Sequence, residues 1–156
     1  MTPHRPTDAD PSSSRLLAKL PVDEYRRIRP LLEPVELVPD QVLYETDGPI
    51  RHAYFPTGGV LSALTIMQDG GAIEVATVGR EGLVGHYGFG GKTSPHRMIA
   101  QIGGRAFRMD SQALADQALR LGPLRNLLNA YQVAFMAQVS QSVACNGLHR
   151  LEQRCC

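Results

Sequence analysis

The stretch AIEVATVGREGLVG, residues 72–85, decides the fold class of this chain. Its first half is a short run rich in β-branched residues, which is typical of a strand. Its second half places glycines at positions 79, 82 and 85, which open a glycine-rich stretch that reaches residue 91. A strand that ends in such a stretch indicates a β structure with close-packed turns.

Short apolar runs of the same kind extend outward from this stretch, between Pro34 and Asp110. Turn residues interrupt them about every 8–12 residues, which predicts an all-β sandwich or roll. Two dipeptides, Asp69-Gly70 and Gly103-Gly104, predict hairpin tips, since both accept positive φ at little cost. The seven expected strands are Val35–Val38, Val42–Tyr44, His52–Phe55, Val60–Met67, Ala72–Val78, Met98–Ile102 and Arg105–Met109.

Helical patterns flank this β region on both sides. Residues 15–32 carry two apolar stripes separated by Pro21 and predict two short helices. After the β region, Asp110 or Ser111 is expected to cap a further helix that Gly122 ends.

The last predicted helix runs from Pro123 to about Arg154 and has no charged residue between Asn126 and Gly147. A helix with one face in water normally carries charges there. We therefore expect two contact faces, one for the β region and one for a second copy of the chain, although a single buried core helix is the alternative. The candidate dimer-interface residues form its apolar stripe, Leu124, Leu128, Tyr131, Phe135, Val139 and Val143.

Composition sets the domain organisation and the compartment. A chain of 156 residues with 43 % apolar residues has one core, and we expect a disordered tail at 1–14, a β domain with its N-terminal helices at 15–122 and a dimerisation helix at 123–156. We expect no signal peptide and no membrane-spanning helix, because residues 1–14 have no apolar stretch and the sequence has no run of about 18 apolar residues. Three cysteines without disulfide or metal spacing indicate a reducing, cytoplasmic location, and the net charge of +1 shows no excess of basic residues for nucleic acid.

An ordered set of segments carries a likeness to known proteins: Val42-Leu43-Tyr44 with Asp47-Gly48, the run His52–Val60, Asp69-Gly70, Glu74–Gly85, Ser94–Arg97 and Leu148–Arg154. Together, over about residues 15–156, they resemble the effector domain of the cyclic-AMP receptor/fumarate-nitrate regulator (Crp/Fnr) family of transcription regulators.

This resemblance implies a double-stranded β-helix, or jelly roll, of the cyclic-nucleotide-binding type that senses a signal. It also implies a homodimer held by the long helix, which in the family leads into a C-terminal winged helix-turn-helix. This sequence stops at Cys156, so we expect DNA binding only in a full-length form that carries that domain.

In the resembled domains a Gly-Glu pair opens a short helix that holds a phosphate, and a later arginine pairs with that phosphate. Gly85 matches the motif glycine, so His86 replaces the motif glutamate, Tyr87 follows it, and Arg97 falls near the arginine position. A histidine cannot replace the carboxylate that accepts from the ribose hydroxyl. These four residues are the ligand-binding candidates, and the missing carboxylate disfavours a cyclic nucleotide against another small, anionic effector.

Other functions stay open at this stage. The roll could act as a scaffold and dimerisation module without a ligand, or as a cupin-like metal-dependent enzyme. Cupins bind metal through an H-x-H pair, and no two of the five histidines lie two apart. A haem held by a residue such as His86 is a weaker option, and an iron–sulfur site lacks its N-terminal cysteines. We predict no catalytic residue, no metal and no resident cofactor.

Overall fold

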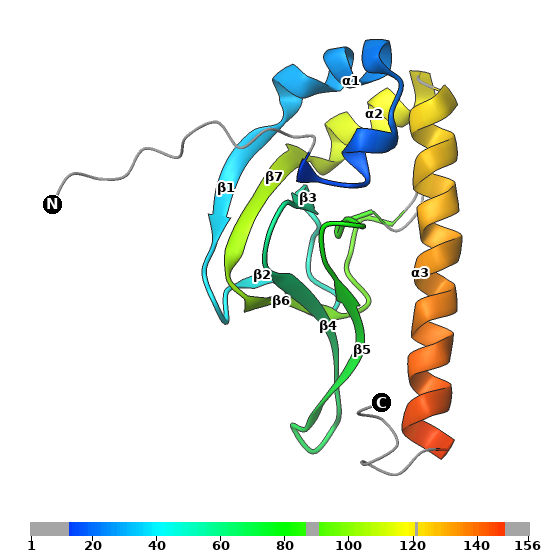
Figure 1. The fold of residues 1–156 in the computed structure, drawn as a ribbon. Helices are drawn as coiled ribbons and strands as arrows, with labels where there is room; N and C mark the ends of the chain where they lie inside the picture. The colour runs from blue at the N-terminus through cyan, green and yellow to red at the C-terminus, as the bar shows by residue number, and fades with distance from the viewer. Residues whose placement is uncertain (1–12, 87–90, 121, 149–156) are drawn as a thin grey trace, which may run out of the picture.

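Seven antiparallel strands form two sheets in the parts of the chain that this computed structural model describes, residues 13–86, 91–120 and 122–148 (Figure 1). One sheet has the order β1-β7-β3 and the other β2-β6-β4-β5. All seven predicted strands are confirmed within two residues of their bounds. They are β1 (Glu33–Leu37), β2 (Val42–Tyr44), β3 (His52–Pro56), β4 (Val60–Ile66), β5 (Ala72–Val78), β6 (Arg97–Ile102) and β7 (Gly104–Asp110).

The two predicted hairpin tips have different outcomes. Asp69-Gly70 does join the paired strands β4 and β5, and Gly70 has a φ of +85°. The prediction for Gly103-Gly104 was wrong, because β6 and β7 belong to different sheets and this dipeptide carries the chain between them. Here glycine is required for space: a Cβ on Gly104 would lie 2.5 Å from the carbonyl carbon of Gly58.

The N-terminal segment is less helical than its apolar stripes predict. It contains a 3-10 turn η2 (Leu17–Lys19), the α-helix α1 (Val22–Ile28) and a second 3-10 turn η3 (Arg29–Leu31). Pro30 lies in the first turn of η3, where it has no backbone N–H to continue the α-helical pattern.

Two helices follow the β region, α2 (Ser111–Arg120) and α3 (Gly122–Leu148). Asp110 caps α2 as predicted, because its carboxylate accepts a hydrogen bond of 2.8 Å from the Ala113 N–H. The start of α3 is held by the N-terminal segment, since the Glu24 carboxylate accepts from the Leu124 N–H at 2.9 Å. The predicted end of this helix near Arg154 lies outside the described residues.

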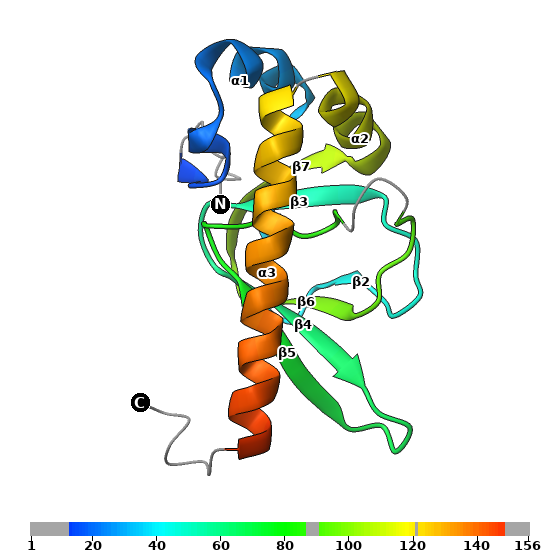
Figure 2. The same cartoon turned by 90° about the vertical axis from the view of Figure 1, so that its right-hand side faces the viewer.

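The core has two clusters, and α3 lies along both of them (Figure 2). The first joins the helices to the three-stranded sheet and includes Phe55 and Leu114. The second fills the interior of the roll around Leu61 and Met98. Because one face of α3 packs on both clusters, the helix bridges the two halves of the molecule.

Candidate functional site

The segment Gly82–His86 passes between β3 and α3. Its backbone is fixed to β3 by a pair of hydrogen bonds, from the Tyr54 N–H to the Val84 carbonyl at 2.9 Å and from the Val84 N–H to the Tyr54 carbonyl at 3.0 Å. We call residues 82–86 the sensor loop. It contains Gly85, the predicted motif glycine, and its neighbour His86.

Gly85 is held in a conformation that only glycine adopts easily. Its φ is +90°, and a Cβ there would lie 2.5 Å from the His52 carbonyl oxygen. The fold itself therefore requires the glycine that the sequence motif singled out.

Gly82 makes the equivalent close approach on the α3 side. A Cβ at this position would lie 2.5 Å from the Tyr131 Oη and 2.7 Å from a ring carbon of the same side chain. The Tyr131 hydroxyl donates a hydrogen bond of 2.9 Å to the carbonyl of Leu83, which is itself buried. The sensor loop thus packs directly against α3 and is hydrogen-bonded to it.

A pocket of about 160 Å³ lies between the sensor loop and α3. His86 and His96 both contribute to its wall, and the helix contributes five of its residues. None of the described residues that line it is Asp, Glu, Lys or Arg. The lining residues are Leu83, Val84, Gly85, His86, Pro95, His96, Tyr131, Gln132, Phe135, Met136 and Val139.

Burial lowers the pKa of both histidines below the usual value. Desolvation disfavours the charged imidazolium form, so both rings are neutral at pH 7. The ring of His96 also lies near β4, with its Nδ1 3.4 Å from the Thr65 hydroxyl oxygen. The described wall of the pocket is therefore mostly apolar and uncharged, and its polar groups include the two imidazoles and the Gln132 amide.

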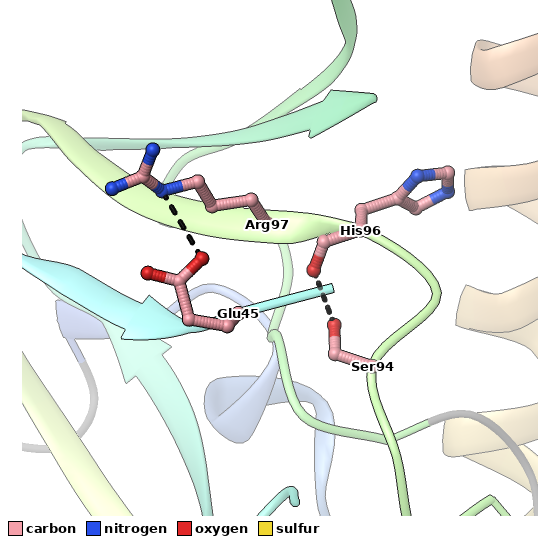
Figure 3. Close-up of polar contacts among 4 residues, drawn as sticks. All are labelled: Glu45, Ser94, His96 and Arg97. Carbon is pink, nitrogen blue, oxygen red and sulfur yellow. Dashed lines mark hydrogen bonds and ion pairs between the residues drawn. The ribbon is translucent and has the colours of Figure 1, made fainter. Parts of the chain in front are cut away.

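Arg97 does not share this pocket. Figure 3 shows its side chain directed toward Glu45, with its Nε 3.4 Å from the Glu45 carboxylate, while the His96 ring points the other way, toward α3. Neighbouring residues at the start of a strand project to opposite faces, so His96 and Arg97 necessarily separate. The structure brings Gly85 and His86 together and leaves Arg97 outside, and Tyr87 lies outside the described residues.

Sequence reasoning missed His96 and the helix residues that close the pocket. His96 was part of the quoted Ser94–Arg97 segment. Side chains alternate between the two faces of a strand, so the rule that directs Arg97 away from the pocket would have directed His96 into it. Phe135 and Val139 were expected to face a second chain, yet they line the pocket and pack against the roll.

Two of the six residues in the predicted dimer stripe are buried in their own chain, which contradicts the prediction at these two positions. Leu124 and Leu128 are 1 % and 0 % exposed within a single chain, so they belong to the core and cannot contact a partner. Of the six stripe residues, Val143 is the one that is well exposed, at 59 %. On the opposite side of α3, Val133 is 73 % exposed.

A larger hollow of about 670 Å³ lies between β5 and the second half of α3. It is more open to solvent than the sensor-loop pocket and contains none of the predicted ligand residues, so we do not treat it as the site. Within the described residues no group of three His, Cys, Asp or Glu side chains is arranged to hold a metal ion, and no helix is long and apolar enough to cross a membrane.

No family model and no curated protein matches this sequence. Solved structures do match it. A cyclic nucleotide-binding domain from Methylobacillus flagellatus KT superposes with a TM-score of 0.71 at 14 % identity, covering 90 % of this chain and 85 % of that one. The fold is that of a cyclic-nucleotide-binding domain.

Two further solved structures share this cyclic-nucleotide-binding fold. The N-terminal domain of a transcriptional regulator from Streptomyces coelicolor A3(2) matches at 17 % identity and a TM-score of 0.60, over 86 % of this chain and 95 % of that domain. FixK2 from Bradyrhizobium japonicum matches at 15 % identity and a TM-score of 0.64, over 70 % of this chain. This chain spans 55 % of the length of FixK2. The predicted jelly roll of the cyclic-nucleotide-binding type is confirmed.

Proposed function

We propose that this chain is the effector-sensing and dimerisation domain of a Crp/Fnr-type transcription regulator. One observation carries the proposal: α3 forms a wall of the sensor-loop pocket with one face, while Val133 on its opposite face is 73 % exposed. A molecule in the pocket touches the loop and the helix together. The fold shared with the N-terminal domain of a transcriptional regulator supports the same reading.

The connection between pocket and helix is direct. An effector that prefers one position of the sensor loop would shift α3 through the Tyr131–Leu83 hydrogen bond and the Gly82–Tyr131 contact. Such a shift requires a different affinity of the effector for the two helix positions. In a longer form, the helix would pass this change to a DNA-binding domain that follows it.

The pocket disfavours a cyclic nucleotide as the effector. Among the described lining residues there is no carboxylate for a ribose hydroxyl and no cation for a phosphate, because His86 replaces the acid and Arg97 is paired with Glu45 outside the pocket. We expect thermal melts with cyclic AMP, cyclic GMP and cyclic di-GMP to equal those in buffer. A ligand at 100 times its Kd would stabilise the fold by about 2.7 kcal/mol, so a clear rise with any of the three would contradict this expectation.

The pairing surface is the open face of α3. Residues that lie opposite the packed face at 100° per residue are small or polar, and a second copy of the same helix fits against them. The face consists of Asn126, Val133, Ala137, Ser140 and Ala144.

Sedimentation velocity tests this surface with a matched pair of variants. We expect the wild type to be a dimer and Val133→Asp to be a monomer, because the substitution places two like charges at the centre of the interface. Val22→Asp is the control, since Val22 is also exposed, at 64 %, but lies on α1. A wild-type monomer at high concentration, or a Val133→Asp dimer, would remove the dimerisation role.

A further inference from the structure

The size of the sensor-loop pocket limits its ligand to about one ring. Its volume is about 160 Å³. An engineered apolar cavity of about 150 Å³ in another protein binds benzene. A cyclic nucleotide combines a purine, a ribose and a phosphate, which is far more than this space contains.

The charge of the pocket limits the ligand to neutral molecules. The part of its wall that the structure describes has no ionised side chain, and burial lowers the pKa of His86 and His96, which favours their uncharged forms. An anion or cation placed here would be desolvated without an opposite charge beside it, which costs several kcal/mol.

Aromatic and thioether groups form the α3 side of the wall. The rings of Tyr131 and Phe135 lie 6.0 Å apart between centroids with planes tilted by 33°. Met136 follows them along the helix and also lines the pocket. An aromatic ring gains edge contacts with such rings and a favourable contact with the sulfur, beyond simple area burial.

A few polar groups interrupt this apolar wall and orient a ligand. They are His86, His96 and the amide of Gln132. A neutral imidazole has one nitrogen that donates a hydrogen bond and one that accepts, and an amide has an N–H donor and a carbonyl acceptor. A hydroxyl group on the ligand can therefore donate to or accept from any of these side chains. Apolar walls with a small number of polar groups are typical of small-molecule sites.

We propose that this pocket binds a neutral molecule of one aromatic ring with a hydroxyl group, of the size of phenol, and that such a molecule is the effector. The assignment rests on the proposed function, because it names the ligand class for the same pocket. The ring of the ligand lies against Phe135, Met136 and Val139, and its hydroxyl group forms a hydrogen bond with an imidazole on the sensor-loop side of the pocket.

Titration of the full chain with phenol, followed by two-dimensional ¹H–¹⁵N NMR, tests the proposal. We expect saturable shifts confined to residues 82–86, 95–96 and 131–139. Benzoate, which adds a charge, and 1-naphthol, which adds a ring, should each bind at least tenfold more weakly than phenol.

A matched pair of variants on α3 locates the site. Val139→Phe fills the pocket and should weaken phenol binding at least tenfold, whereas Val143→Phe makes the same change on an exposed residue one turn further and should leave binding within twofold. Met136→Trp is a second filling variant at a position that is 58 % exposed, so it tests the pocket even if Val139→Phe does not fold.

The outcomes separate this proposal from the one on which it rests. Absence of saturable phenol binding, equal binding of benzoate, or equal loss in Val143→Phe and Val139→Phe would overturn the ligand class. If phenol fails while Val133→Asp still converts a dimer into a monomer, the dimerisation role stands without this ligand. A wild-type monomer overturns the proposed function whatever phenol does.

Discussion

Replacing Gly82 by alanine tests the contact between the sensor loop and α3. The new Cβ would lie 2.5 Å from the Tyr131 Oη and 2.7–2.8 Å from two carbons of its ring, where ordinary contacts begin at 3.4 Å. Gly82 is not among the glycines with positive φ, so alanine fits the backbone, and the three atoms nearest to the new Cβ all belong to Tyr131. Tyr131 is half-buried and cannot move without losing its bond to Leu83.

The cost follows from these two effects. Overpacking a well-filled site costs about 1–3 kcal/mol, and a lost hydrogen bond about 0.5–1.5 kcal/mol, so Gly82→Ala should lower the free energy of unfolding by about 2–4 kcal/mol. For a chain of this size the melting temperature should fall by roughly 5–15 °C.

Urea unfolding followed by circular dichroism measures this change, provided that the m-values agree. Gly122→Ala is the control, because a Cβ there meets no atom within 4 Å and alanine favours a helix. In the background of Tyr131→Ala, Gly82→Ala should cost less than about 0.5 kcal/mol, which makes the double-mutant coupling as large as the single effect. Additive effects of the two substitutions would refute the contact as the cause.

Further predictions concern protons, a helix cap and the arginine outside the pocket. Burial lowers the pKa of His86 and His96, so below about pH 6.5 the unfolded chain binds more protons than the folded chain. The free energy of unfolding should therefore be constant above that pH and fall as the pH drops toward the lowered pKa values. His96→Gln should reduce the difference in this free energy between urea melts at pH 7.5 and pH 5. Asp110→Ala should cost about 1 kcal/mol in the same assay, and Asp110→Asn should retain most of the cap. Arg97→Gln should leave phenol binding unchanged, because Arg97 does not line the pocket.

The β region was predictable because its signals are local. Alternation over a few residues and turn dipeptides such as Asp69-Gly70 specify a strand and its end without knowledge of the rest of the fold. The N-terminal segment was less predictable. Its apolar pattern does not show that Val22 is 64 % exposed or that Leu31 lies in a 3-10 turn and not in an α-helix.

The candidate site was predictable only at its loop. A glycine at position 85 has a local cause, the positive φ and close contact with β3, so a motif can locate it. Side chains alternate between the two faces of a strand, so the position at which β6 begins decides whether His96 or Arg97 faces the pocket. A shift of one residue would exchange their directions.

The direction of the α3 stripe could not be read from its spacing. Apolar residues at helical intervals show that a face is buried but not which of two surfaces buries it. The structure shows that Leu124 and Leu128 pack within their own chain, and our proposal therefore places the pairing surface on the small and polar residues of the other side.

The hydrogen bond from Leu124 to Glu24 fixes the first turn of α3, and the Tyr131–Leu83 bond lies a short way along the same rod. Past Tyr131 the helix keeps contact with the roll through Phe135 and Val139 and through the hydrogen bond from the Gln138 amide to the Thr77 carbonyl at 2.9 Å. At 1.5 Å per residue, the segment from Tyr131 to Leu148 is about 25 Å long, and a tilt of about 5° at Tyr131 would displace its end by about 2 Å. A change in the loop would therefore reach the end of the helix only if these contacts with the roll shift together with it.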